Sequence, residues 1–222
     1  MTRPIDTLLF DFDGTIFDTA PDIIDALNHV LQSHGRPTVA LETLRSRING
    51  GSIALLGHGF NIDEHHPDFE KLKAELLAHY GTIRNFKARY FDGMETVLEY
   101  LNQKQIPWGI VTNRLSTLAQ PLLDNHPTSG KPHCLIGSDM VKNIKPHPES
   151  LLQACQLMKI EPHQALYIGD SRSDIEAAHA AGMSSMLALY GYIGEYENPE
   201  EWNAHYYVRN PIEIIDWIEK TF

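Results

Sequence analysis

Two aspartates, Asp11 and Asp13, follow a short apolar segment near the start of the sequence, in the run Asp11-Phe12-Asp13-Gly14-Thr15. Two carboxylates this close repel each other, and a divalent cation is the natural way to keep both ionised. A carboxylate can also attack phosphorus and form an acyl phosphate. Acidic pairs are common in surface turns, but the position after an apolar run and before a glycine that permits a sharp turn favours a site.

Two further polar segments suggest phosphoryl binding. Thr112 and Asn113 follow a second apolar run and offer donors for a phosphoryl oxygen, although a turn or a helix cap would use the same residue types. Lys145 stands directly before Pro146 in a chain that is acidic overall. It could neutralise a carboxylate nucleophile and a transferring phosphoryl group, and taken alone it would be a solvated surface charge.

A fourth polar segment, Ile168-Gly169-Asp170-Ser171-Arg172-Ser173-Asp174, again follows an apolar run. Asp170 could ligate a hard cation, and Asp174 could orient a metal-bound water or Lys145. An acidic helix N-terminus would explain the same residues. Because all four segments come directly after apolar runs, we expect them to meet in one site.

Short apolar runs alternate along the chain with stretches of helical spacing. This alternation predicts an α/β fold with a doubly wound parallel sheet, in which ligands bind at the carboxyl ends of the strands. The predicted strands are Thr7–Phe12, Trp108–Val111, Cys134–Ile136, Ala165–Ile168, Ser185–Leu189 and an edge strand at Tyr206–Val208. The predicted helices between and after them are Gly93–Gln103, Thr117–Asn125, Pro148–Met158, Asp174–Ala181 and a closing helix at Pro211–Phe222.

The segment from Asp22 to Arg89 differs, because it contains no convincing strand. Its apolar spacing predicts several helices, among them Asp22–His34 and Pro67–Tyr80. We therefore expect a catalytic core made of residues 1–19 and 90–222. Residues 20–89 are expected to form a helical cap domain, inserted after the first strand and lowered over the active site.

The order and spacing of the four polar segments resemble the signature motifs of the haloacid dehalogenase (HAD) superfamily of phosphotransferases, and the resemblance covers essentially the whole chain. It implies that Asp11 is the nucleophile. It implies that Asp13 is the general acid and base, which protonates the leaving alcohol and then deprotonates the attacking water. Thr112 and Lys145 would bind the phosphoryl oxygens, with assistance from Asn113.

The same resemblance implies a magnesium ion, Mg²⁺, as the cofactor. The ion would be held by Asp11, by the backbone carbonyl of Asp13, by Asp170 and by waters that Asp174 helps to position. The core would be Rossmann-like, and the helical insertion resembles the cap that this superfamily places after its first motif. Such a cap opens for substrate and closes to exclude water.

A finer resemblance is to phosphoglycolate phosphatases, through the run Asp11-Phe12-Asp13-Gly14-Thr15-Ile16-Phe17-Asp18-Thr19-Ala20-Pro21-Asp22. One departure is Arg114, where such proteins usually carry lysine. The charge is kept, so we expect catalysis to survive with a small difference in phosphate or substrate contact. Within that group the sequence is most similar to bacterial N-acetylmuramic acid 6-phosphate phosphatases, through Phe91-Asp92-Gly93-Met94, Val141-Lys142-Asn143-Ile144-Lys145-Pro146, Tyr190-Gly191-Tyr192-Ile193 and Asn198-Pro199-Glu200-Glu201-Trp202.

Substrate choice is expected to depend on the helical segment. Arg45 and Arg47 precede Asn49-Gly50-Gly51, a flexible turn that could bring backbone N–H groups against a sugar or carboxylate. A helix end with solvated arginines would account for the same residues. The expected substrate-binding residues are Asn113, Arg114, Arg47, Asn49, Gly50 and Gly51.

Composition limits the possible partners. The 222 residues carry a formal net charge of −11, which argues against a nucleic-acid partner. The two cysteines, Cys134 and Cys155, have no metal-binding or redox spacing and are expected to be reduced. No run approaches the ~18 apolar residues of a membrane span. We expect a cytoplasmic enzyme, a monomer or a homodimer, that acts on a small-molecule phosphate ester.

Three other functions compete with a Mg²⁺-dependent phosphomonoesterase. A dehalogenase of the same fold needs neither magnesium nor a second acid/base carboxylate, so Asp13 argues against it. A phosphosugar mutase would keep all four motifs, and only the finer resemblance disfavours it. A non-enzymatic binding or regulatory module predicts at least one broken catalytic position, whereas Asp11, Asp13, Lys145 and Asp170 are all present.

Overall fold

The computed structural model describes residues 5–128 and 130–221, and these form two compact units. The first, called here the core unit, comprises the chain up to Asp18, Tyr90–Gly191 and the chain from Glu197 onward. The second, the helical unit, comprises Thr19–Arg89 and Tyr192–Tyr196. Each unit is described separately.

The core unit is built on a six-stranded sheet with the order β5-β4-β1-β6-β7-β8, in which every neighbouring pair is parallel. Its central strands β1, β4 and β6 are buried along their whole length, because helices cover both faces of such a sheet. The strands are β1 (Thr7–Phe10), β4 (Trp108–Val111), β5 (Leu135–Ile136), β6 (Ala165–Gly169), β7 (Ser184–Ala188) and β8 (Tyr206–Val208).

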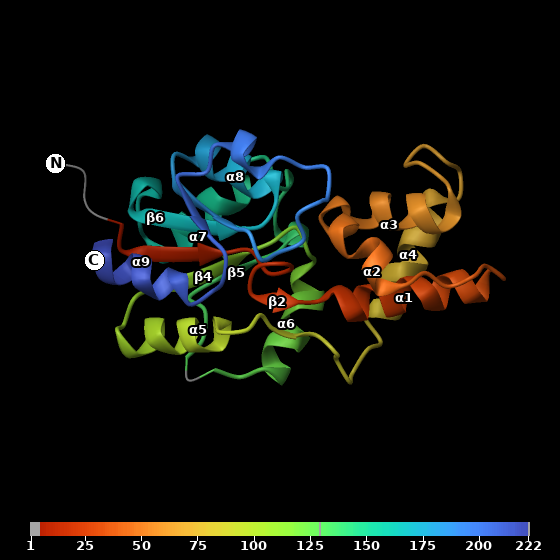
Figure 1. The fold of residues 1–222 in the computed structure, drawn as a ribbon, viewed down its shortest axis with the longest axis horizontal. Coiled ribbons are helices and arrows are strands. Elements are labelled where there is room, and N and C mark those ends of the chain that lie inside the picture. Colours follow the sequence, from red (N-terminus) through yellow and green to blue (C-terminus); the bar gives the residue numbers. More distant parts are fainter. Residues whose placement is uncertain (1–4, 129, 222) are drawn as a thin grey trace. The chain divides into compact units, whose positions relative to one another are not determined.

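The helices of the core unit flank this sheet in two layers, as Figure 1 shows. α7 and α8 pack on each other on one side, and α5 and α9 pack on each other on the opposite side. Beneath α7 and α8, a core cluster joins residues of these helices to strand residues such as Leu9, Val111 and Tyr167. These helices are α5 (Met94–Gln103), α6 (Ser116–Asn125), α7 (Glu149–Met158), α8 (Arg172–Ala181) and α9 (Glu213–Thr221).

The strand order reverses at β1, and this reversal determines where a ligand can bind. From β1 the chain builds outward through β4 and β5, and then returns to the other side of β1 to add β6, β7 and β8. The carboxyl ends of β1, β4 and β6 therefore lie side by side, and a crevice forms at such a switch point. The residues that follow these three ends are Asp11, Thr112 and Asp170.

The doubly wound parallel α/β sheet predicted from the sequence is confirmed, and each predicted strand is present within a residue or two of its observed limits. The prediction that the segment from Asp22 to Arg89 contains no strand is wrong for the last residue of that segment, Arg89, which begins a strand. β2 (Phe17–Asp18) pairs with β3 (Arg89–Tyr90), and the Phe17 ring stacks on the Tyr90 ring with centroids 4.5 Å apart. Strands of two residues are too short to show a period of two in a sequence. The end of the predicted closing helix, Phe222, lies outside the described residues.

Four helices and a 3-10 turn form most of the helical unit. α1 and α4 pack on each other, and buried Leu27, Leu31, Leu72 and Leu76 supply much of the apolar surface between helices. The elements are α1 (Ala20–Ser33), α2 (Leu41–Leu44), a 3-10 helix at Arg45–Gly50, α3 (Gly51–Phe60) and α4 (Phe69–Tyr80). No helix in the described part of the chain combines the length and apolar character needed to cross a membrane.

The segment Tyr192–Tyr196 joins the helical unit although it follows the core strand β7 in sequence. The Tyr192 hydroxyl accepts a hydrogen bond from the backbone N–H of Ala20 at 2.9 Å. The Tyr192 backbone carbonyl accepts a hydrogen bond from the Asn49 side chain at 3.3 Å, and the Arg45 guanidinium lies 5.2 Å from the centroid of the Tyr192 ring. Tyr192 is only 1% exposed, so this tyrosine anchors the segment to the helices.

Candidate active site

Buried carboxylates gather at the carboxyl ends of the central strands of the core unit. Asp11 follows β1, Asp170 follows β6, and Asp174 lies in the first turn of α8. One carboxylate oxygen from each of these three residues lies within 4.8 Å of the others. Asp11 is 8% exposed, and Asp170 and Asp174 are fully buried. The structure therefore brings together aspartates that lie up to 163 positions apart in the sequence.

Lys145 enters this acidic cluster with a side chain that is 1% exposed. Its ammonium nitrogen lies 2.6 Å from Asp174 Oδ1 and 3.0 Å from Asp11 Oδ1. It also donates hydrogen bonds to the Tyr167 hydroxyl at 2.7 Å and to the Val111 carbonyl at 3.3 Å. A buried ammonium group is stable only with such partners, so these contacts fix its position.

Burial and neighbouring charges change the pKa values of both members of the central ion pair. Burial raises the pKa of Asp11 from 3.8 to about 7; Lys145 opposes this rise, and the carboxylates of Asp174 and Asp13 add to it. For Lys145, burial alone would lower the pKa, but the attraction of Asp11 and Asp174 outweighs it and the pKa is raised. The single positive charge of Lys145 is thus shared by more than one buried carboxylate, so the cluster retains excess negative charge.

These residues fit a hard divalent cation. Asp11 Oδ1 is buried and has no hydrogen-bond partner among the described residues, since its 3.0 Å contact with Lys145 lacks hydrogen-bond geometry. Mg²⁺ prefers oxygen ligands, so it would supply the partner that the buried Asp11 Oδ1 lacks and offset the excess of carboxylate charge around it. Asp174 differs from the other two, because its oxygens are taken by Lys145 and by the Ser171 hydroxyl and N–H. It is therefore placed to orient Lys145.

Two glycines leave room for Asp170. Gly14 has a φ of +79°, and a Cβ atom there would lie 2.1 Å from Asp170 Oδ2. A Cβ atom at Gly191 would lie 2.2 Å from Asp170 Cβ. The Thr15 hydroxyl donates a hydrogen bond to Asp170 Oδ1 at 3.3 Å. The orientation of Asp170 thus depends on close approach of the backbone from both sides.

This packing predicts that Gly14→Ala weakens metal binding by displacing Asp170. We expect the Mg²⁺ concentration for half-maximal activity to rise at least about 10-fold, as for other changes around a metal ligand. Gly182→Ala is the matched control, because Gly182 has a similar φ of +75° but its Cβ would meet nothing within 4 Å. An equal Mg²⁺ requirement in the two variants would contradict the role given to Gly14.

Asp13 and Arg114 form an ion pair beside the cluster. The Arg114 side chain is 7% exposed, and its Nη2 lies 2.6 Å from Asp13 Oδ1. Arg114 Nε donates to Asp13 Oδ2 at 2.9 Å and is 3.2 Å from Oδ1. The guanidinium therefore contacts both oxygens of the carboxylate that was expected to act as acid and base.

The residues after β4 connect the cluster to its surroundings. The Thr112 hydroxyl, 3% exposed, accepts a hydrogen bond from the Arg114 N–H at 3.1 Å. The Asn113 side chain bonds the backbone of Lys145 in both directions, each at 3.0 Å. Asn113 thus ties the loop that carries Lys145 to the end of β4.

With this geometry in place, comparison with known proteins assigns the family. The family model for haloacid dehalogenase-like hydrolases matches residues 8–188. The chain belongs to the haloacid dehalogenase-like hydrolases. The resemblance expected from the four polar segments is confirmed, and the core unit of this hydrolase carries all of them at one end of its sheet.

Relatives of the hydrolase are named as phosphatases. The chain is 35% identical to an N-acetylmuramic acid 6-phosphate phosphatase of Pseudomonas putida over 96% of each chain. It is 38% identical to a phosphoglycolate phosphatase of Xanthomonas campestris pv. campestris over 93% of each. These relatives confirm the prediction of a phosphoric monoester hydrolase of this family.

Solved structures confirm the fold. A crystal structure of a predicted phosphoglycolate phosphatase from Haemophilus somnus superposes with a TM-score of 0.81 at 23% identity, covering 96% of this chain and 98% of that one. A haloacid dehalogenase-like family protein from Streptococcus pneumoniae gives a TM-score of 0.79 at 23% identity, with the same coverage.

The expected substrate-binding residues of the helical unit are all exposed, namely Arg47, Asn49, Gly50 and Gly51. The flexible turn predicted at Asn49-Gly50-Gly51 is instead a junction, where the 3-10 helix at Arg45–Gly50 runs into α3. Gly51 has a φ of +58°, which a glycine adopts without strain and which lets the chain turn directly into the next helix.

Some residues that shape the site of the hydrolase were not predicted. Tyr167 lies within buried β6, accepts a hydrogen bond from Lys145 and donates one to the Val111 carbonyl at 2.7 Å. Burial and the nearby Asp174 raise its pKa well above 10, so its hydroxyl stays protonated. The sequence signal was a tyrosine in an otherwise apolar strand. Ser171 was a second signal, since its side chain and that of Asp174 form the capping box of α8.

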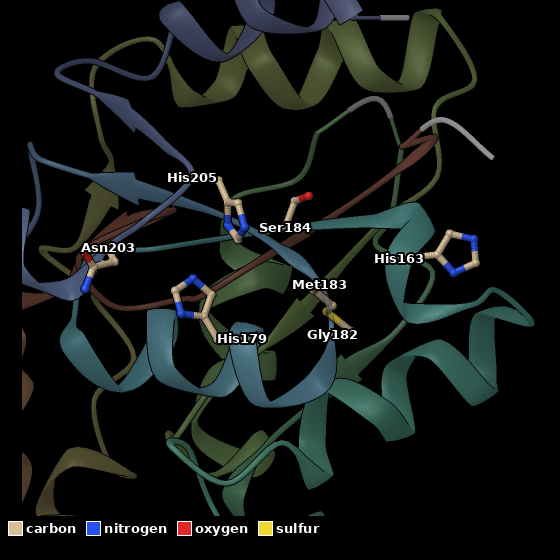
Figure 2. A pocket seen from close by; sticks show the side chains of 7 residues that line it. All are labelled: His163, His179, Gly182, Met183, Ser184, Asn203 and His205. Atoms are coloured by element: carbon tan, nitrogen blue, oxygen red, sulfur yellow. The ribbon is translucent and has the colours of Figure 1, made fainter. Parts of the chain in front are cut away.

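A separate hollow of about 450 Å³ lies at the other end of α8, lined by His163, His179, Gly182, Met183, Ser184, Asn203 and His205. Figure 2 shows the rings of His179 and His205 close together and His163 apart from them. His179 Nε2 and His205 Nδ1 both contact the Ser185 hydroxyl, at 3.1 and 2.9 Å. These nitrogens therefore serve to join α8, β7 and the segment before β8.

Proposed function

We propose that this hydrolase is a Mg²⁺-dependent phosphomonoesterase that transfers the phosphoryl group of a small metabolite to Asp11 and then to water. The observation that carries the proposal is the state of Asp11. Its carboxylate is buried at the end of β1, lies 3.0 Å from the Lys145 ammonium, and has an oxygen without a hydrogen bond among the described residues. A buried carboxylate with so few hydrogen bonds is poorly solvated, which favours its attack on phosphorus.

In the first step, a carboxylate oxygen of Asp11 attacks phosphorus and the bond from phosphorus to the ester oxygen breaks. Asp13 gives its proton to the departing oxygen, which leaves as an alcohol. Lys145 stabilises the negative charge on the transferring group, and the Thr112 hydroxyl donates to a phosphoryl oxygen. Asp174 and Tyr167 hold the Lys145 ammonium in place during this step.

In the second step, Asp13 takes a proton from water, and the water oxygen attacks the phosphorus of the aspartyl phosphate. The bond between phosphorus and Asp11 breaks, which releases phosphate and restores the carboxylate. One residue thus acts first as an acid and then as a base, and the proton balance of the two steps closes without another group.

Asp11, Asp170 and the backbone carbonyl of Asp13 would hold Mg²⁺, and Asp174 would orient Lys145 beside them. When bound, the ion supplies Lewis-acid stabilisation of the phosphoryl oxygens and compensates the excess charge of the cluster. This assignment is supported by the three carboxylate oxygens that lie within 4.8 Å of one another.

The substrate is proposed to be a small phosphorylated metabolite, either 2-phosphoglycolate or N-acetylmuramic acid 6-phosphate. The proposal is supported by relatives named for these two activities at 38% and 35% identity. We further propose that the helical unit serves as the cap domain and supplies the substrate contacts, from Arg47, Asn49, Gly50 and Gly51. Asn113 of the core unit would assist.

The proposal is tested by measuring phosphate release from p-nitrophenyl phosphate, 2-phosphoglycolate, N-acetylmuramic acid 6-phosphate and glucose 6-phosphate, with Mg²⁺ and with EDTA. We expect hydrolysis of the aryl ester with Mg²⁺ only, and the highest kcat/KM on one of the two named metabolites. Fluoride with beryllium or aluminium should inhibit, because these complexes imitate a phosphoryl group on a carboxylate. Full activity in EDTA would exclude the metal-dependent mechanism.

A phosphosugar mutase remains the alternative of the same fold. It would convert a sugar phosphate into its isomer with little release of inorganic phosphate, so assaying both products of glucose 6-phosphate separates the two activities. A non-catalytic module would release no phosphate from any of the four esters.

A further inference from the structure

We propose that Arg114 is a positioning residue that holds the Asp13 carboxylate in the orientation from which it exchanges protons with the leaving group and with water. The inference rests on the proposed function, because it assigns a purpose to a residue that contacts the acid and base of that reaction. Arg114 was expected to contact phosphate or substrate. The structure instead places its guanidinium on Asp13.

The contact is a two-point one. Nη2 donates to Asp13 Oδ1 at 2.6 Å, and Nε donates to Oδ2 at 2.9 Å. A single contact would leave the carboxylate free to rotate about its Cβ–Cγ bond, whereas a fork on both oxygens fixes its plane as well as its position. A lysine at this position would provide one point charge and no such constraint on the plane.

Arg114 is itself held by the core unit. Its backbone N–H donates to the Thr112 hydroxyl at 3.1 Å, and its carbonyl accepts from the Ser138 N–H at 3.0 Å. Its guanidinium carbon lies 5.6 Å from the centroid of the Phe12 ring, and the side chain is 7% exposed. An arginine fixed by its backbone, by an aromatic ring and by burial is suited to fix its partner.

Positioning of Asp13 has a distinct kinetic consequence. The value of kcat/KM reports the steps up to departure of the alcohol, and Asp13 acts there as an acid. An alkyl alkoxide is a poor leaving group and needs that proton, whereas p-nitrophenolate leaves without it. A poorly oriented Asp13 therefore lowers kcat/KM on an alkyl phosphate much more than on an aryl phosphate.

The experiment compares Arg114→Leu, Arg114→Lys and the unchanged protein, each saturated with Mg²⁺. The substrates are p-nitrophenyl phosphate and whichever of the three alkyl esters tested above is hydrolysed fastest. For Arg114→Leu, the ratio of kcat/KM on the alkyl ester to that on the aryl ester should fall at least about 10-fold, since general acid catalysis contributes about 10²- to 10⁴-fold. Arg114→Lys should give an intermediate ratio. Arg209→Leu, an exposed arginine of the core unit, should leave the ratio unchanged.

An equal fall in kcat/KM on both esters would assign Arg114 to phosphoryl binding and overturn the inference, and so would an unchanged ratio. Thermal unfolding establishes that the variants are folded. If Arg114→Leu does not fold, the ratio for Arg114→Lys decides, and a ratio equal to that of the unchanged protein overturns the inference. The proposed function fails separately, when the unchanged protein hydrolyses neither ester or Asp11→Asn hydrolyses both.

Discussion

Asp11→Asn is expected to lower kcat by at least about 10⁴-fold, comparable to the loss of a nucleophile in other covalent enzymes. The amide keeps the size and shape of the side chain but cannot form the acyl phosphate. Phosphate release from p-nitrophenyl phosphate measures the effect.

Although Asp11→Asn should lose activity, its stability relative to the unchanged protein should increase as the pH rises. The folded, metal-free protein holds a proton on Asp11 up to about pH 7, whereas the unfolded chain loses it near 3.8. Across that window the folded state binds more protons, so the contribution of Asp11 to the free energy of unfolding falls as pH rises. Asparagine has no such dependence. In EDTA, the stability of Asp11→Asn relative to the unchanged protein should increase from about pH 5 to about pH 8, by on the order of a few kcal/mol.

Asp216→Asn is the control, because Asp216 is an exposed aspartate of α9 in the same unit. It should retain full activity and show no pH-dependent gain. Turnover by Asp11→Asn within 10-fold of that by Asp216→Asn would remove Asp11 from the mechanism, since a nucleophile contributes far more than this.

The second large effect is expected for Lys145→Met, which should lower both stability and activity. The change leaves Asp11 and Asp174 buried without their shared cation, and removal of one partner of a buried ion pair costs about 3–5 kcal/mol. It also removes the charge that stabilises the transferring phosphoryl group, so kcat should fall at least about 10²- to 10³-fold. Urea denaturation in EDTA and phosphate release measure the two effects.

A compensating variant separates the two roles of Lys145. Lys145→Met combined with Asp174→Asn removes one buried charge of each sign, so part of the lost stability should return while activity stays low. Lys142→Met is the matched control, because Lys142 lies three positions away and is exposed. If Lys145→Met unfolded at the same urea concentration as Lys142→Met, this result would contradict the structural role of Lys145.

The sheet could be predicted because its strands are easy to recognise as apolar runs in the sequence. β1, β4 and β6 are short apolar runs buried on both faces, and each is followed by polar residues that the interior cannot accept without partners. The positions of Asp11, Thr112 and Asp170 follow from that pattern and from the rule for switch points. Pairing of β2 with β3 could not be predicted, because it joins residues 17–18 to 89–90 through only two positions on each side.

The contacts that complete the site could not be predicted from the sequence, for a different reason. Arg114 reaches Asp13 across 101 positions, and Tyr167 reaches Lys145 across 22. Residue types alone indicate that an arginine or tyrosine can bind a polar partner, but not which one. The choice is made by the register of neighbouring strands, which places β6 beside β1. The same holds for Tyr192, whose anchoring to α1 depends on tertiary packing.

The central claim is that Asp11 carries the phosphoryl group between substrate and water. The most direct test is to mix the protein with substrate and Mg²⁺, quench it in acid during turnover, and analyse its peptides by mass spectrometry. We expect the added mass of one phosphoryl group on the peptide that contains Asp11, located on that residue and absent from Asp11→Asn. A phosphoryl group on another side chain, or an unmodified Asp11 peptide while phosphate is being released, would contradict the mechanism.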